Sequence, residues 1–110
     1  MTPTSHKGQQ PSYPLAKVKE LALADNALMI TGNALLSAQN CFGWDRADVV
    51  KAIRAMRSCD FDISIDSKNR PGTMLDVYKI IGHKKHDIYT HFYIDSNTGF
   101  LIINSFKKLE

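Results

Sequence analysis

The residues best suited to chemistry lie near the carboxyl terminus, in the stretches 89–93 and 105–107. Tyr89 and His91 stand two residues apart, and a Ser105-Phe106-Lys107 run follows close to the end of the chain. An unperturbed histidine titrates near about 6.5 and a tyrosine near about 10, so both can exchange protons, whereas a lysine stays positive and holds anions. Together these residue types predict an anion-binding surface that carries an acid–base group.

A hairpin between two predicted strands would bring these residues together. The connecting segment Asp95–Gly99 ends in a glycine, which suits the left-handed position of a three-residue hairpin loop. Counting back from a Ser96–Phe100 pair sets Tyr89 opposite Lys107.

Alternation of side chains along these strands predicts two different faces. The apolar, core-forming face carries Ile88, Phe92, Ile94, Phe100, Ile102 and Phe106. The polar face carries Tyr89, His91, Tyr93, Ser105 and Lys107. The polar face is either a functional surface or an ordinary solvent-facing side of a sheet, where tyrosine is favoured for its strand propensity alone.

Positive charge gathers in the second half of the chain. The net charge is +3, but residues 1–67 are balanced, and residues 68–108 hold seven Lys and Arg against three Asp. A lysine or arginine beside a phosphate releases condensed counterions, so this half indicates a polyanionic partner. The alternative is a solvated face that only confers solubility. The loop candidates for nucleic-acid contact are Lys68, Arg70, Lys84 and Lys85.

Metal binding is not expected in this basic region. His83 and His86 flank Lys84-Lys85, but adjacent lysines repel a cation and no third ligand is indicated. The run is typical of an exposed basic turn, with phosphate steering as its functional alternative.

Three helices and four strands are expected to position these groups. Helices are predicted from Pro14 to Asp25, from Thr31 or Asn33 to about Cys41, and from the N-cap Asp45 onward. After Asp60 the hydrophobic period changes to two, which predicts strands at 61–66, 74–81, 87–95 and 100–107. This order indicates an α+β fold, with three N-terminal helices packed on one face of a mainly antiparallel sheet.

The length and composition predict one globular domain, residues 13–110, after a flexible lead-in at 1–12. No apolar run is long enough for a membrane span and no signal peptide is evident, which favours a cytoplasmic protein. Cys41 and Cys59 are expected to be free, part-buried thiols in a reducing compartment, since a catalytic thiol would have no local motif. Trp44 is expected to pack between helices, with base stacking as the alternative.

Several short motifs resemble the motility-quorum-sensing-regulator (MqsR) toxin family, in the family's order. They are Leu15-x-x-Val18-Lys19-x-Leu21, Thr31-x-x-Ala34-Leu35, Asp60-Phe61, Asp76-Val77-Tyr78, Tyr89 and Ser105-Phe106-Lys107. The resemblance covers roughly residues 13–108, and the terminal Ser-Phe-Lys is its most specific part. The final hairpin is slightly longer here than in the family.

The resemblance implies a RelE-like ribonuclease toxin fold and cleavage of single-stranded mRNA, commonly at GC-containing sites, with no metal or other cofactor. It also implies a protein antitoxin as partner. Of four family active-site residues, the tyrosine carries over to Tyr89 and one lysine to Lys107. The other lysine position is Ile63 and the glutamine position is Leu75. Lys68 or Arg70 is a candidate to replace the missing cation.

These observations predict a role for each candidate. Lys107 would hold the phosphate, Tyr89 would donate to it or transfer a proton, and His91 would add an acid–base group that the family lacks. Tyr93 would offer a stacking surface to an unpaired base. The alternatives are an inactive module of the same fold that binds RNA or an antitoxin, and a plain protein-interaction domain.

Overall fold

The computed structural model describes residues 7–8 and 10–110 of the chain. The lead-in predicted to be flexible, residues 1–12, therefore falls largely outside the described residues. Its described end is packed against the domain. The Ser12 N–H donates to the carboxylate of Asp76 at 2.9 Å, and the Ser12 hydroxyl lies 2.6 Å from that of Ser64.

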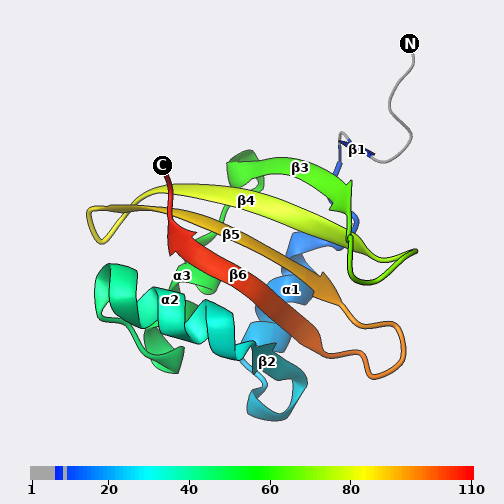
Figure 1. Ribbon diagram of the computed structural model, residues 1–110, viewed down its shortest axis with the longest axis horizontal. Helices are drawn as coiled ribbons and strands as arrows, with labels where there is room; N and C mark the ends of the chain where they lie inside the picture. The colour runs from blue at the N-terminus through cyan, green and yellow to red at the C-terminus, as the bar shows by residue number, and fades with distance from the viewer. Residues whose placement is uncertain (1–6, 9) are drawn as a thin grey trace.

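The chain forms an α+β domain, as predicted, with the helices first and most of the sheet after them (Figure 1). The helices are α1 Leu15–Ala22, α2 Gly32–Phe42 and α3 Arg46–Ala55, with short 3₁₀ turns at Asp25–Ala27 and Ser58–Asp60. The strands are β1 Lys7–Gly8, β2 Leu28–Ile30, β3 Phe61–Asp66, β4 Met74–His83, β5 His86–Ile94 and β6 Leu101–Lys108.

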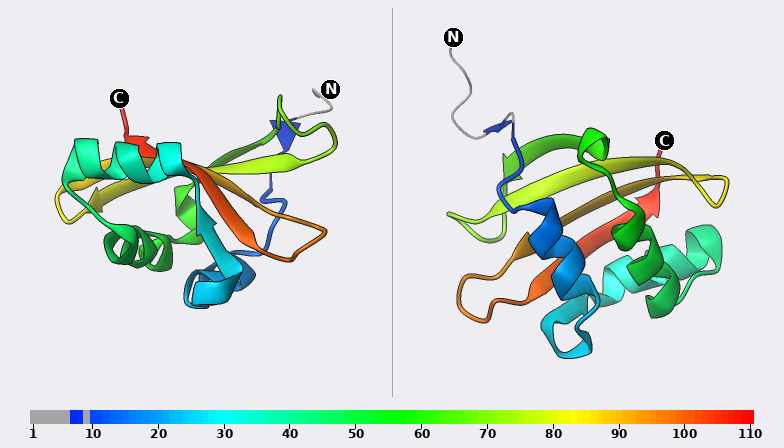
Figure 2. Two further views of the ribbon diagram at one scale, coloured as in Figure 1. Left: turned by 60° about the horizontal axis from the view of Figure 1, so that its bottom comes forward. Right: turned by 180° about the vertical axis from the view of Figure 1, so that it is seen from behind.

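Within the described residues these strands make one six-stranded sheet in the order β1-β3-β4-β5-β6-β2. All neighbours are antiparallel except β2, which pairs parallel with β6. Helices α1 and α3 lie against one face, and α2 runs along β6 (Figures 1 and 2). Among the residues that the structure describes, no helix covers the opposite face of β4, β5 and β6 (Figure 2).

Local signals in the sequence account for the helix boundaries. The Thr31 hydroxyl accepts from the Ala34 N–H and so caps α2, which ends at Gly43. Asp45 and Asp48 form a reciprocal capping box at the start of α3, where their negative charge also complements the helix dipole. Thr31, rather than Asn33, is therefore the N-cap of α2.

A single apolar core fills the space between the helices and the sheet. Its fully buried members include Val18 of α1, Ile53 of α3 and Phe92 and Phe106 of the sheet. Trp44 is part of this core and stacks on Phe42 with ring centroids 4.5 Å apart, so the packing interpretation of Trp44 is confirmed.

Asp76 and Tyr78 have structural roles. The buried carboxylate of Asp76 accepts from the N–H groups of Ser12 and Tyr13, and Tyr78 is fully buried on Phe92. By contrast, Cys41 and Cys59 are free but exposed, so their predicted partial burial is wrong. Cys41 lies on the outer side of the last turn of α2, and Cys59 lies in the exposed turn before β3.

The register between β5 and β6 differs from the simple count along the hairpin. The loop closes on Asp95 and Phe100, whose backbone groups bond at 2.9 Å, and Gly99 takes the left-handed conformation at φ 76°. The pairing is therefore one residue out of step with the prediction as far as Phe92–Ile103. A bulge at Asn104 then adds one residue to β6 and restores the predicted pairs from His91–Ser105 onward.

This bulge corrects the predicted faces of β6. Phe106 lies in the main core as expected, but so do Leu101 and Ile103, while Phe100 and Ile102 lie on the other face. The physical reason is the period of two, because one extra residue moves every side chain beyond it to the opposite face.

A second bulge lies between β4 and β5. Ile81 and Gly82 stand opposite the single residue Asp87, whose carboxylate accepts from the Gly82 N–H at 2.9 Å. Gly82 has φ 77°, a conformation that side-chain-bearing residues rarely adopt. The bulge shifts the pairing of β4 by one residue and places Lys79 opposite Tyr89.

Candidate active site

Three adjacent strands place Lys79, Tyr89 and Lys107 in one row on the helix-free face. Tyr89 pairs with Lys79 on one side and with Lys107 on the other. The predicted pairing of Tyr89 with Lys107 is thereby confirmed. The Lys107 ammonium lies 5.2 Å from the centroid of the Tyr89 ring, within the range of a cation–π contact.

The row opens onto a hollow of ≈ 400 Å³ at the end of the sheet where β6 finishes. It is lined by Lys79, Tyr89, Lys107, Lys108, Leu109 and Glu110. The lining residues include three lysines and one acidic residue, Glu110, so positive charge predominates. The hollow is suited to a phosphate group.

His91 lies directly beside Tyr89 along β5. Its Nδ1 is 3.0 Å from the Tyr89 hydroxyl, so the two side chains share a hydrogen bond. Partial burial, with a smaller contribution from the Lys107 charge, holds the pKa of His91 below its usual 6.5. At neutral pH His91 is therefore mainly uncharged and can accept a proton.

Tyr89 is shifted in the opposite sense. Partial burial raises its pKa above 10, and the nearby carboxylate of Asp62 raises it further. The phenol therefore keeps its proton at neutral pH and donates it, which fits a hydrogen bond from the Tyr89 hydroxyl to the neutral His91 ring.

The sequence analysis did not predict Lys79 or Asp62 as residues of the site. The Lys79 ammonium lies 3.4 Å from an Asp62 carboxylate oxygen, at the edge of the row. A count from the Lys84-Lys85 turn would set Lys79 opposite Thr90, on the core face. The bulge at Gly82 instead brings Lys79 opposite Tyr89. Asp62 lies in another bulge, between Phe61 and Ile63 of β3. The combination of Gly82 with Asp87 was the one signal that could have indicated the first bulge.

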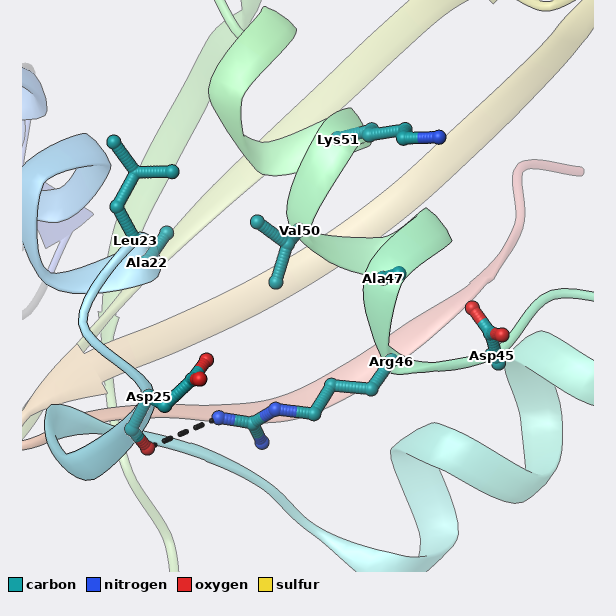
Figure 3. A pocket seen from close by; sticks show the side chains of 8 residues that line it. All are labelled: Ala22, Leu23, Asp25, Asp45, Arg46, Ala47, Val50 and Lys51. Carbon is teal, nitrogen blue, oxygen red and sulfur yellow. Dashed lines mark hydrogen bonds between the residues drawn. The ribbon is translucent and has the colours of Figure 1, made fainter.

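A second hollow, of ≈ 520 Å³, lies between the end of α1 and α3 (Figure 3). Its lining is mainly apolar, with Ala22, Leu23 and Val50 facing one another, and it contains none of the predicted site residues. Arg46 crosses its floor and donates to the carbonyl oxygens of Asp25 and Leu28 at 3.2 and 3.0 Å. These bonds give Arg46 a structural role in tying α3 to the turn before β2.

Two classes of feature are absent from the part of the chain that the structure describes. Residues 7–8 and 10–110 bring no three His, Cys, Asp or Glu together as metal ligands would be. No helix among them is both long and apolar enough to cross a membrane.

The sequence profile of a known family matches residues 10–108, nearly the whole chain. Its description is "Motility quorum-sensing regulator, toxin of MqsA". The chain belongs to this toxin family. No curated protein matches the chain at a significant level. The protein is thus a toxin of the toxin–antitoxin kind, and the shared motifs can be located in its structure.

The two motility-quorum-sensing-regulator positions that differ here lie on the same face as the row. Ile63 pairs with Val77, and Leu75 packs with Tyr93 and Ile102 in a small apolar cluster. This cluster occupies the face beyond His91, away from the hollow. Ile63 and Leu75, where the resemblance implied polar side chains, thus contribute an apolar surface on the face that carries Tyr89 and Lys107.

Tyr93 does not offer the free stacking surface that was predicted for it. Only 4% of the residue is exposed, and the guanidinium carbon of Arg70 lies 5.2 Å from the centroid of its ring. The physical reason is its neighbours, because Tyr93 packs with Leu75 and with its cross-strand partner Ile102 in a small apolar cluster.

Arg70 and Lys68 lie away from the Tyr89–Lys107 pair. They belong to the β3–β4 loop, at the end of the sheet opposite to the end of β6 (Figure 1). Arg70 sits over Tyr93, which is four residues from Tyr89 on β5 and hence about 13 Å away.

Lys84 and Lys85 form the two-residue turn between β4 and β5. Both have positive φ, 51° and 70°, as the turn of a tight hairpin requires. They are exposed at the same end of the sheet as the end of β6 (Figure 1). His83 and His86 pair at the base of this turn and pack edge-on against Trp44, which gives them a structural role.

Proposed function

We propose that this toxin is a metal-independent endoribonuclease that cleaves single-stranded mRNA in the cytoplasm and is neutralised by a cognate antitoxin. The observation that supports it best is the hydrogen-bonded Tyr89–His91 pair beside Lys107 in a positive hollow. Tyr89 and Lys107 line the hollow, and His91 is a proton acceptor that reaches it through the Tyr89 hydroxyl. Family membership supports the same activity.

The proposed reaction uses the 2′-hydroxyl of the RNA as its nucleophile. The 2′-oxygen attacks phosphorus, the bond from phosphorus to the 5′-oxygen breaks, and the products are a 2′,3′-cyclic phosphate and a free 5′-hydroxyl. Tyr89 takes the 2′-hydroxyl proton as it passes its own to His91. Lys107 stabilises the extra charge on phosphorus and gives a proton to the leaving oxygen.

The direct test is incubation of the full chain with a single-stranded transcript in the presence of EDTA. We expect cleavage that persists at high EDTA and yields ends carrying a 2′,3′-cyclic phosphate. Sequencing of the ends tests the predicted preference for GC-containing sites. Cleavage that EDTA abolishes, or ends that carry a 3′-hydroxyl, would contradict the proposed chemistry.

The pH dependence of cleavage provides a second prediction. The rate requires His91 to be neutral and both Tyr89 and Lys107 to be protonated. Because the pKa of His91 lies below 6.5 and that of Tyr89 above 10, we expect a wide plateau with its acid limb below pH 6.5 and its alkaline limb above pH 10. A rate profile measured on a short oligoribonucleotide checks this. An acid limb above pH 7 would exclude His91 as the proton acceptor.

Ile63 and Leu75 favour one competing function, a toxin-fold module that binds RNA or an antitoxin but has lost catalysis. Two of the four family active-site positions carry no polar group, so the remaining residues would have to sustain the whole reaction. Strongly salt-dependent RNA binding without cleavage in the EDTA experiment would establish this alternative.

A further inference from the structure

We propose that Lys79 is a second phosphate-binding cation of this site and that Asp62 is the positioning residue that holds it there. This assignment rests on the proposed ribonuclease activity, since it names another residue for the same reaction. It gives the site a replacement for the cation that the family places at the position of Ile63.

The geometry places Lys79 and Lys107 symmetrically about Tyr89. They are its two cross-strand neighbours, so their Cα atoms are separated by two strand spacings, about 10 Å. Both side chains line the same hollow as the Tyr89 ring. A phosphate above Tyr89 is therefore within reach of both ammonium groups.

Asp62 explains how Lys79 can stay in this row. Lys79, Lys107 and Lys108 all line the hollow and repel one another in the free protein. The Asp62 carboxylate, 3.4 Å from the Lys79 ammonium, offsets part of this repulsion. Because the two side chains are 46% and 40% exposed, their ion pair is weak and screened. A phosphate can thus engage Lys79 at little cost.

Asp62 also acts on Tyr89 through its charge. Burial is the larger cause of the raised pKa of Tyr89, and the Asp62 carboxylate adds to it. The other charged or titratable groups around Tyr89 are Lys79 and Lys107 on the flanking strands, His91 on the same strand, and Lys108 and Glu110 around the hollow. Removing the charge of Asp62 lowers the pKa of Tyr89. The alkaline limb of the rate profile then moves to lower pH, an effect that a purely structural role of Asp62 would not produce.

The first experiment compares Lys79→Met with Lys17→Met, both made in the full chain. Lys17 is a matched control, because it is also exposed and paired with an acid, Glu20, at 3.5 Å, but lies on α1. We expect Lys79→Met to lower kcat by about 10² and Lys79→Arg to recover most of the loss. Equal activity of the two Met variants, with both folded by circular dichroism, would overturn the proposal.

The second experiment measures binding of a single-stranded oligodeoxythymidylate, which has no 2′-hydroxyl to react. Each phosphate contact adds about 0.7 to the slope of log affinity against log salt for single strands. Lys79→Met should lose about that much slope, whereas Lys17→Met should keep the wild-type slope. If the wild-type chain fails to cleave RNA, the proposed activity is wrong, and this slope still decides whether Lys79 contacts phosphate.

The role of Asp62 is tested with Asp62→Asn, which keeps the shape of the side chain. We expect kcat to fall several-fold and the alkaline limb to move to lower pH. An Asp62→Asn variant with a wild-type rate profile would overturn the positioning role, whatever Lys79 does.

Discussion

Lys107→Met should reduce the rate of RNA cleavage by about 10² to 10³, the usual loss when one group that stabilises transition-state charge is removed. We expect this substitution to have the largest single effect, because the Lys107 ammonium lies against the Tyr89 ring and Lys107 lines the hollow. Its charge also helps to lower the pKa of His91. The methionine keeps most of the apolar stem, so packing along the strand is retained. Single-turnover kinetics on a short oligoribonucleotide give the measurement.

The same variant should also move the acid limb of the rate profile. The Lys107 charge helps to hold the pKa of His91 down, so its removal raises that pKa and shifts the limb to higher pH. Lys51→Met serves as the control, since Lys51 is exposed on α3 beside the hollow between α1 and α3. A Lys107→Met variant as active as Lys51→Met would remove the central group from the proposed mechanism.

Tyr89→Phe should lower kcat by about 10², within the range for loss of a group that transfers a proton. The substitution removes only the hydroxyl that bonds to His91 and leaves the ring beneath Lys107 in place. We therefore expect the effect in kcat, with KM and the unfolding midpoint nearly unchanged.

Tyr93→Phe is the matched control for Tyr89→Phe. This substitution also removes only a phenolic hydroxyl. Tyr93 lies four residues further along β5 on the same face, but its ring is buried under Arg70. We expect it to cleave at close to the wild-type rate. Equal losses in the two variants would mean that the hydroxyl of Tyr89 has no special role.

The local signals of this sequence were strong where structure depends on short-range chemistry. Thr31, Gly43 and Asp45 mark helix boundaries because capping involves residues only a few positions apart. The strict alternation after Asp60 predicted β3, and the hairpin count placed Tyr89 opposite Lys107. That count was correct only because two departures cancelled, the longer loop before Phe100 and the bulge at Asn104.

The bulges were decided by the tertiary structure. At Asn104 the extra residue allows Leu101 and Ile103 to enter the core together with Phe106, which a regular strand could not do. Burial of apolar side chains contributes more than the regularity of one ladder step, so the core selects the register.

The sequence by itself determined the α+β architecture and the family. These follow from periodicity, capping and motif order, which are properties of neighbouring residues. Only the tertiary structure decided which other groups share the site. It brought in Lys79 and Asp62 and left Lys68 and Arg70 at the far end of the sheet. The reason is that a bulge is chosen by packing across strands, and each one reverses the face of every residue beyond it.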